Sequence, residues 1–168
     1  MAEIRLACEA GATLMALGLG SCVAVCAFDR GARLAGMAHV VLPDSRAAAA
    51  GTPGKFADTA VPALIDALCA AGAARRTLVA VVVGGAQLFA FAGTGPRLDV
   101  GDRNATAVLD ALRRAALPVV ARDLGGAIGR TVHLHAGSGL VRVRTVGGLP
   151  RTLAVLGEAR AARVQLAA

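Results

Sequence analysis

Aromatic residues are scarce in this 168-residue chain, which has four Phe and neither Trp nor Tyr. Proteins that bind single-stranded nucleic acids stack the bases on aromatic side chains, so this class of partner is poorly supported. Lysine is nearly absent too: of 18 basic residues only Lys55 is not Arg, and the arginines form no dense tract. The net charge of +7 and the pI of about 10.9 therefore do not predict nucleic-acid binding, but they allow an acidic protein partner.

Long apolar runs are also missing, although 56% of the residues are hydrophobic and only 17% are charged. The best candidate for a membrane span, residues 78–92, is too short and is interrupted by Gly84-Gly85, so no direct membrane insertion is expected. Intrinsic disorder is excluded, because a disordered chain has low hydrophobicity and high charge. The four Cys form no CxxC pair, which favours reduced thiols and a cytoplasmic location over zinc or disulfides.

Export remains an alternative, because the sequence Leu19-Gly20-Ser21-Cys22 resembles a lipoprotein cleavage site. A protein acylated at Cys22 would lack residues 1–21 in its mature form. Glu3 and Glu9 argue against this alternative, since the start of a secretory signal peptide is basic.

The length fits a single domain, taken as residues 1–168, with ample small aliphatic side chains for a closely packed core. Apolar runs bounded by turn residues predict two or three strands between residues 14 and 42, including a hairpin with strands apolar on both faces. Asp58 is expected to cap the first helix and Gly72 to end it. The pattern predicts an α+β (mixed α/β) fold with mixed sheets packed together and helices outside. The expected strands are 23–28, 34–42, 78–83, 118–121, 132–134 and 140–146, and the expected helices are 59–71, 104–116 and 151–164.

Cys22 is the candidate nucleophile, because the glycine-rich bend ending in Gly20 and Ser21 presents its thiol at the start of a buried strand. Such a bend can aim successive backbone N–H groups at an oxyanion formed beside the nucleophile. A thiol with a pKa of about 8.5 needs a neighbouring base at neutral pH. His39 lies in the second arm of the predicted hairpin, where antiparallel pairing can bring it beside Cys22.

Structural roles are open for the same residues, since a buried Cys often acts as a small hydrophobe and a buried His often bonds only to backbone. His133 and His135 alternate on one strand and could form half a metal site, but no third ligand is evident, so no metal is expected. Gly84-Gly85 and residues 125–129 lack the residue order of a phosphate-binding loop, and they are interpreted as turns near the site.

Six sequence blocks occur in a defined order: LGLGSCVAV (17–25), GMAHVVLPDS (36–45), PGKFADTAV (53–61), VGGAQLF (83–89), VGDRN (100–104) and ARDLGGAIGR (121–130). Together they resemble the CheD family, the chemoreceptor glutamine deamidases of bacterial and archaeal chemotaxis. The likeness runs from about residue 17 to residue 146. The resemblance implies that Cys22 is the nucleophile and His39 its base, with no cofactor. It also implies chemotaxis receptors as substrate, methylesterase activity on the same receptor sites, and the phosphatase CheC as a second partner.

One position departs from the family pattern, which has a catalytic Thr six residues before the nucleophile, where this chain has Ala16. Corrupting the third residue of a serine-protease triad costs about 10⁴ in turnover, whereas losing the nucleophile of a related enzyme costs about 10⁶. Thr13, Ser21 or a backbone carbonyl could orient His39 instead. The sequence therefore predicts an active, slow deamidase, with a regulatory protein that binds receptor or CheC without turnover as the alternative.

Overall fold

A computed structural model describes residues 1–46, 52–88 and 99–158 of the chain. These residues form two α-helices, two short 3₁₀ segments and nine strands. The helices are α1 (Ala57–Ala70) and α2 (Val100–Arg114), and the 3₁₀ segments are Pro53–Lys55 and Arg75–Thr77. The strands are β1 (Ile4–Ala7), β2 (Thr13–Leu19), β3 (Val23–Asp29), β4 (Leu34–Val40), β5 (Leu78–Gly84), β6 (Val119–Leu124), β7 (Arg130–His135), β8 (Leu140–Thr145) and β9 (Arg151–Val155).

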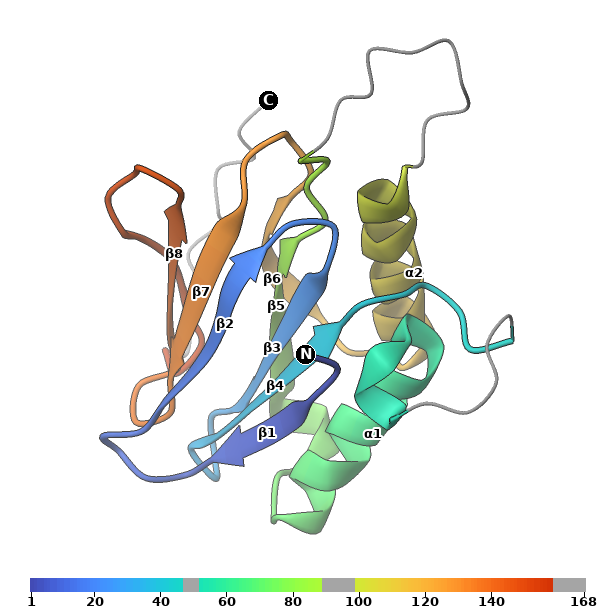
Figure 1. Ribbon diagram of the computed structural model, residues 1–168. Coiled ribbons are helices and arrows are strands. Elements are labelled where there is room, and N and C mark those ends of the chain that lie inside the picture. Colours follow the sequence, from blue (N-terminus) through green and yellow to red (C-terminus); the bar gives the residue numbers. More distant parts are fainter. Residues whose placement is uncertain (47–51, 89–98, 159–168) are drawn as a thin grey trace, which may run out of the picture.

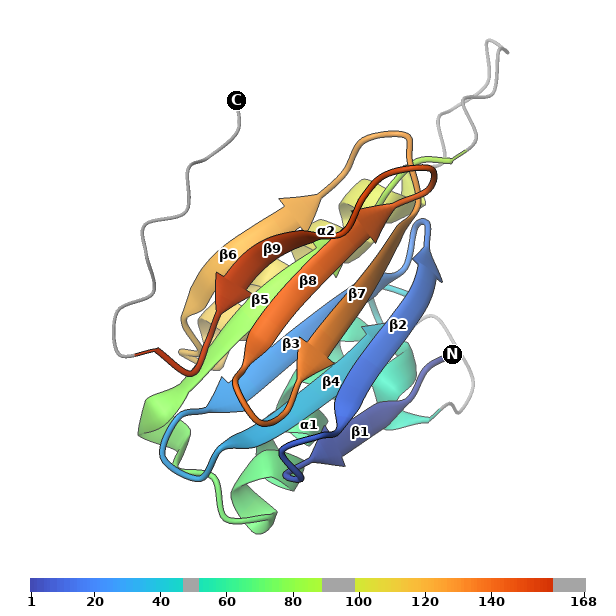
Figure 2. The same ribbon diagram turned by 90° about the vertical axis from the view of Figure 1, so that its left-hand side faces the viewer.

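The elements stack in three layers, with both helices on one face of a five-stranded sheet and a four-stranded sheet on its other face (Figure 1). The five-stranded sheet has the order β1-β4-β3-β5-β6, and β5 and β6 are its parallel pair. The four-stranded sheet, β2-β7-β8-β9, is antiparallel throughout and lies in front of the other sheet in Figure 2. This arrangement confirms the α+β class, the mixed sheet and the outer position of the helices.

Strand β3 lies at the centre of the molecule, and all seven of its residues are buried. Val23 and Val25 face the helices and pack in one core with Leu64 of α1. Ala24 and Cys26 face the four-stranded sheet and pack in a second core. Since both faces are covered, the strand carries no polar alternation, as the sequence predicted. Each buried Val contributes roughly 1.5–3 kcal/mol relative to an exposed one.

Both helices begin earlier than the sequence predicted. Helix α1 begins at Ala57, so Asp58 does not cap it; the carboxylate of Asp58 instead accepts hydrogen bonds from the N–H and the hydroxyl of Ser45. Helix α2 begins at Val100, four residues before the predicted start at Asn104. Helix boundaries depend on which tertiary partners satisfy the terminal groups, and sequence periodicity does not reveal these partners.

The predicted C-terminal helix over residues 151–164 is wrong in its first part, which forms strand β9, while residues 159–164 lie outside the described residues. Leu153 is buried against the second core, and β9 pairs with β8. Strand pairing with a partner that is already in place outweighs a weak helical pattern.

The first two strands are integral to the sheets, since β1 pairs with β4, and β2 pairs with β7. Ala16 and Leu19 of β2 are buried in the second core. Cleavage before Cys22, as export with acylation would require, would therefore remove an edge strand from each sheet. Within the three described ranges, no helix is long and apolar enough to cross a membrane.

Candidate active site

Cys22 lies in the short connection between β2 and β3, at the point where the chain crosses from one sheet to the other. Two residues that follow β5 donate backbone hydrogen bonds to this connection. The N–H of Gly85 donates to the carbonyl of Cys22 at 2.9 Å, and the N–H of Ala86 donates to the carbonyl of Gly20 at 2.7 Å. These bonds fix the backbone on both sides of Ser21.

The backbone N–H groups of Ser21 and Cys22 donate to no acceptor among the described residues. Because the carbonyls of this bend are engaged while these N–H groups are not, the bend has donors available for a bound oxyanion. An oxyanion-binding role for Gly20 and Ser21 stays a prediction.

The end of β5 and the glycine-rich segment that follows β6 lie close to this bend. Gly84 adopts φ +122°, and a Cβ atom there would lie 2.2 Å from the carbonyl oxygen of Cys22, so the close approach requires glycine. The N–H of Gly125 donates to the carbonyl of Gly84 at 3.0 Å. Backbone hydrogen bonds thus link the bend at Cys22 to the end of β5, and the end of β5 to the segment after β6.

His39 lies on β4, directly opposite Ala24 of β3. Cys22 precedes Ala24 by two residues, so Cys22 and His39 are diagonal neighbours on one face of the two-strand ribbon. This face is the one that packs against the four-stranded sheet, because Met37, two residues before His39, belongs to that core and Cys22 packs against it. The structure therefore brings the two predicted dyad residues to one face, as hairpin pairing implied.

Burial favours the neutral form of both groups of this pair. The pKa of the Cys22 thiol is raised by burial, an effect that the nearby Met1 ammonium group partly opposes. Burial lowers the pKa of His39, the Met1 ammonium group lowers it further, and the charge of Glu3 opposes both effects. A neutral imidazole beside a neutral thiol is the protonation state in which the ring can accept the proton of the thiol.

Ala16 of β2 and His39 of β4 line the same cavity, although they belong to different sheets. The cavity has a volume of about 290 Å³, and its lining also includes Met37, Glu3 and Arg5. Nε2 of His39 is buried and has no hydrogen-bond partner among the described residues. Position 16, where the resemblance implied a threonine hydroxyl, thus carries a methyl group that lines the same cavity as His39, whose Nε2 makes no hydrogen bond to any described residue.

Thr13 does not replace that hydroxyl. Its side chain lies 3.0 Å from Nδ1 of His135, with which it is paired across β2 and β7. Thr13 and Ala16 are three positions apart, so strand alternation places Thr13 on the outer face of the four-stranded sheet, away from His39. The suggestion that Thr13 orients His39 is therefore corrected.

Asn104 is the site residue that sequence reasoning missed. It lies on α2 with none of its surface exposed, and its Nδ2 donates to the carbonyls of Ser21 and Val41, each at 2.8 Å. A signal for it was present, because Asn104 occupies the apolar stripe of α2 that continues with Val108 and Leu112. A polar side chain in a buried stripe needs a specific partner.

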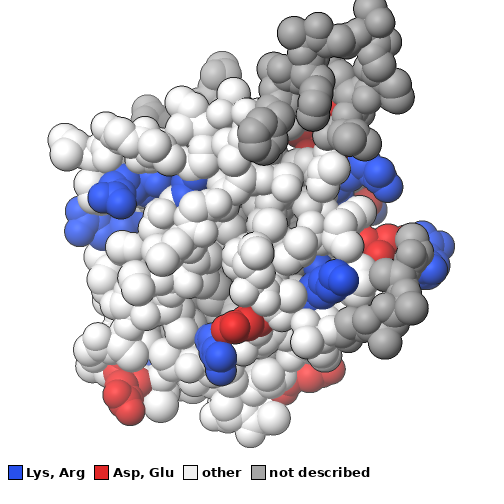
Figure 3. Space-filling view, viewed as in Figure 1, with Lys and Arg blue, Asp and Glu red and all other residues white. Residues whose placement is uncertain are grey.

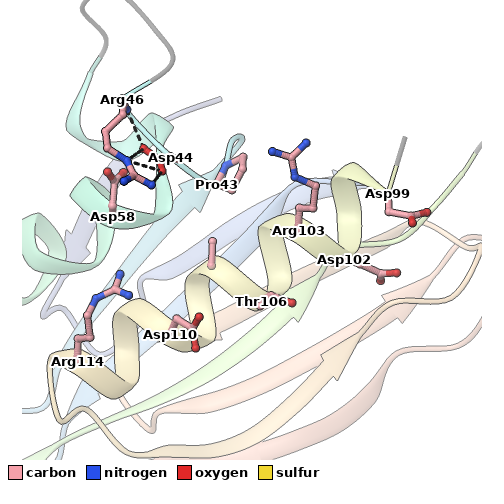
Figure 4. Close-up of a pocket in the computed structure, with 11 residues that line it drawn as sticks. Pro43, Asp44, Arg46, Asp58, Asp99, Asp102, Arg103, Thr106, Asp110 and Arg114 are labelled. Carbon is pink, nitrogen blue, oxygen red and sulfur yellow. Dashed lines mark hydrogen bonds and ion pairs between the residues drawn. The ribbon is translucent and has the colours of Figure 1, made fainter. Parts of the chain in front are cut away.

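A larger groove, of about 730 Å³, lies on the other side of the molecule, between α2 and the segment that follows β4. Figure 4 shows Arg103 and Arg114 extending from α2 toward this segment, where Asp44 forms an ion pair with Arg46. The groove is lined by both acidic and basic side chains, and neither Cys22 nor His39 is among its lining residues.

Comparisons with known proteins are consistent with one family. The family model described as "CheD chemotactic sensory transduction" matches residues 41–145. A protein of Desulfitobacterium hafniense (strain DSM 10664 / DCB-2) is 42% identical over 146 residues, covering 87% of this chain and 91% of its own length. One of Symbiobacterium thermophilum is 44% identical, covering 88% and 90%, and one of Methanococcus vannielii is 47% identical, covering 75% and 80%. All three relatives are named "Probable chemoreceptor glutamine deamidase CheD".

Proposed function

Since the chain belongs to the CheD family, we propose that it is a chemoreceptor glutamine deamidase with Cys22 as nucleophile and His39 as general base. The observation that carries the proposal is the placement of these two side chains on one face of the β3–β4 ribbon. The names of the relatives support the proposed reaction, and the placement of the two side chains on one face supports the proposed choice of residues.

The reaction begins with a glutamine side chain of the receptor lying against Cys22. His39 takes the proton of the thiol, and the thiolate attacks the carboxamide carbon. The carbon–nitrogen bond then breaks, and ammonia leaves with the proton that His39 returns. Water, deprotonated by the same ring, hydrolyses the thioester to a glutamate side chain and restores the thiol. The balance requires water alone, so we propose no cofactor.

Negative charge develops on the carboxamide oxygen during the attack. The N–H groups of Ser21 and Cys22 are the donors we assign to it, because no described residue uses them in the resting structure. Removing one such donor in other acyl-transfer enzymes costs about 10²–10³ in turnover. The fixed backbone around Gly20 keeps these donors in place before the substrate arrives.

The proposed partners are chemotaxis receptors as substrate and, where it is present, the phosphatase CheC. An acidic receptor surface fits the charge of this protein. Figure 3 shows basic side chains gathering over β8, from which Arg142 and Arg144 project into solvent. Charge complementarity of this kind accelerates encounter more than it strengthens the final complex.

Ala16 supports a second candidate function, a regulatory protein that holds receptor or CheC without turnover. Without a hydroxyl beside it, Nε2 of His39 has no partner among the residues described, so the ring depends on packing for its orientation. A binder of this kind needs the fold and the surface but not the dyad.

One experiment separates the two functions. Purified full-length protein is incubated with a receptor cytoplasmic fragment, and released ammonia is measured together with peptide masses that locate each glutamine converted to glutamate. A deamidase converts specific glutamines, and Cys22→Ala abolishes the conversion while receptor binding persists. Conversion that survives Cys22→Ala would overturn the assignment of the nucleophile, and binding without conversion by the wild type would favour the regulatory protein.

A further inference from the structure

Two buried side-chain atoms in the described part of the chain have no hydrogen-bond partner, Nε2 of His39 and Oδ1 of Asn104. A buried polar atom without a partner costs about 1–3 kcal/mol, and such atoms persist mainly where function requires them. One of the two belongs to the proposed general base. The other belongs to Asn104, which donates a hydrogen bond to the carbonyl of Ser21, the residue before Cys22. Both atoms therefore belong to residues of the proposed site or in contact with it.

The amide of Asn104 joins two segments that the sheet leaves unjoined. The ladder between β3 and β4 ends at the pair Val23–Val40. Beyond this pair, Nδ2 of Asn104 donates to the carbonyls of Ser21 and Val41, each at 2.8 Å. Only the NH₂ group of the amide can donate to two carbonyls, so these contacts also fix which way the amide faces. Asn104 thus links the two chain segments just beyond the last backbone pair of β3 and β4.

The two joined segments are the ones that carry the dyad. Ser21 immediately precedes Cys22, and Val41 follows His39 by two residues. From these contacts we infer that Asn104 is a positioning residue, which sets the separation of Cys22 and His39 without touching the substrate. This inference rests on the proposed function, because it assumes that the dyad performs the reaction.

Helix α2 is suited to this task because its start is packed closely against the same turns. A Cβ atom at Gly101 would lie 2.4 Å from the carbonyl oxygen of Gly85, whose own N–H holds the carbonyl of Cys22. The helix therefore cannot shift relative to the nucleophile bend without breaking these contacts. A side chain on a rigid element positions a reacting group more accurately than one on a loop.

The test compares Asn104→Ala and Asn104→Gln with the wild type in the full chain. For Asn104→Ala we expect kcat to fall on the order of 10²-fold, as a displacement of about 1 Å can cause, with KM nearly unchanged. Asn104→Gln retains the two donors on a longer side chain, and it should recover part of kcat. Asp29→Ala is the matched control, because Asp29 is also a buried polar residue but lies at the opposite end of β3.

A merely structural role predicts a different result. If Asn104 only stabilises the fold, Asp29→Ala and Asn104→Ala should lose kcat in proportion to their unfolded fractions, measured by urea denaturation. Retention of kcat within a factor of about two in folded Asn104→Ala would also overturn the inference, because such a change is under 0.5 kcal/mol in the barrier.

A second readout does not depend on turnover. Peptide mass mapping gives the rate at which iodoacetamide alkylates Cys22 at each pH. We expect this rate to show an inflection at the ionisation of His39, because the charge of the ring changes the thiolate population of Cys22. Asn104→Ala should weaken this inflection, and Asp29→Ala should preserve it. An inflection that Asn104→Ala leaves unchanged would overturn the inference. If the wild type released no ammonia, the proposed function would fail while this measurement still decided the role of Asn104.

Discussion

Ala16 and His39 line one cavity from opposite sheets, Ala16 on β2 and His39 on β4. Ala16 is buried, and Nε2 of His39 has no partner in the described part of the molecule. A threonine hydroxyl at position 16 could donate or accept one hydrogen bond, whereas the methyl group can do neither. We therefore expect the residue at position 16 to influence the turnover of the proposed dyad.

Restoring the hydroxyl should therefore raise turnover. Ala16→Thr is expected to increase kcat at least about tenfold, because a hydrogen bond that holds the general base in its productive orientation is a large part of what a third catalytic residue supplies. The measurement is ammonia release from a receptor fragment under saturating conditions.

Ala16→Val is the control for this experiment, since valine matches threonine in shape but has no hydroxyl. It should leave kcat near the wild-type value. If both variants raised kcat equally, packing and not hydrogen bonding would limit the enzyme, and the explanation given for the Ala16 departure would be wrong.

The pH dependence of the reaction follows from the environment of His39. Its pKa lies below the ordinary value of 6.5, so the ring becomes neutral, and able to accept a proton, as the pH rises through a value below 6.5. We expect kcat/KM to rise through this ionisation and to be level at neutral pH. At the alkaline end it should fall only above pH 9.0, because the pKa of Cys22 is raised from that value.

Glu3 provides a test of this assignment, because its charge raises the pKa of His39. Glu3→Gln removes the charge and should move the acid limb of the profile to lower pH. An acid limb that lies above 6.5, or that does not respond to Glu3→Gln, would mean that another group controls the reaction.

The hairpin that carries the dyad could be predicted from the sequence because its determinants are local. Asp29-Arg30-Gly31 predicts the turn, which the structure forms over residues 30–33, and both arms are largely apolar. The turn fixes the register, so the pairing that runs from Asp29–Leu34 to Val23–Val40 follows by counting. The placement of His39 and Cys22 on one face of this ribbon follows from the same register.

The surroundings of the dyad could not be predicted in this way, because they depend on the contact of one sheet with the other. Nothing local indicates that Ala16 faces His39 while Thr13 faces solvent, since this depends on the register of β2 with β7. Asn104 is 82 residues from Cys22 in the chain, and its role depends on how α2 packs. Strand β9 escaped prediction because its pairing with β8 outweighs its local pattern.

Asp29 should contribute strongly to stability at the end of β3 that lies far from the site. Its carboxylate accepts hydrogen bonds from the N–H groups of Gly31, Ala32 and Ala74 and from the hydroxyl of Thr77. Burial alone would raise the pKa of Asp29, but these bonds hold it below the ordinary value of 3.8. Asp29→Ala is expected to cost about 3 kcal/mol in the free energy of unfolding, since bonds to a charged group are individually worth about 1.5–3 kcal/mol.

The contribution of Asp29 also has a defined pH dependence. Because the folded-state pKa is depressed, the stabilisation is complete well above pH 3.8 and is lost as the pH falls through the folded-state pKa. Urea denaturation of the wild type and of Asp29→Ala at neutral pH and near pH 3 tests this. The difference between the two proteins should shrink at acid pH, and a constant difference would show that the carboxylate charge is not involved.

Asp123 should hold the two sheets together through a pair of arginines that differ in exposure. Its Oδ1 accepts from Nε of Arg130 at 2.8 Å, and its Oδ2 accepts from Arg151 at 2.6 Å, so that β6 of one sheet is joined to β7 and β9 of the other. The side chain of Arg130 is 10% exposed and that of Arg151 is 56% exposed.

Asp123→Ala leaves a buried guanidinium without its carboxylate and should lower the free energy of unfolding by about 3 kcal/mol or more. Arg151→Ala removes a solvated pair and should cost under about 1 kcal/mol. The measurement is urea denaturation of both variants, and equal losses would mean that burial of Arg130 does not control the stability of this contact.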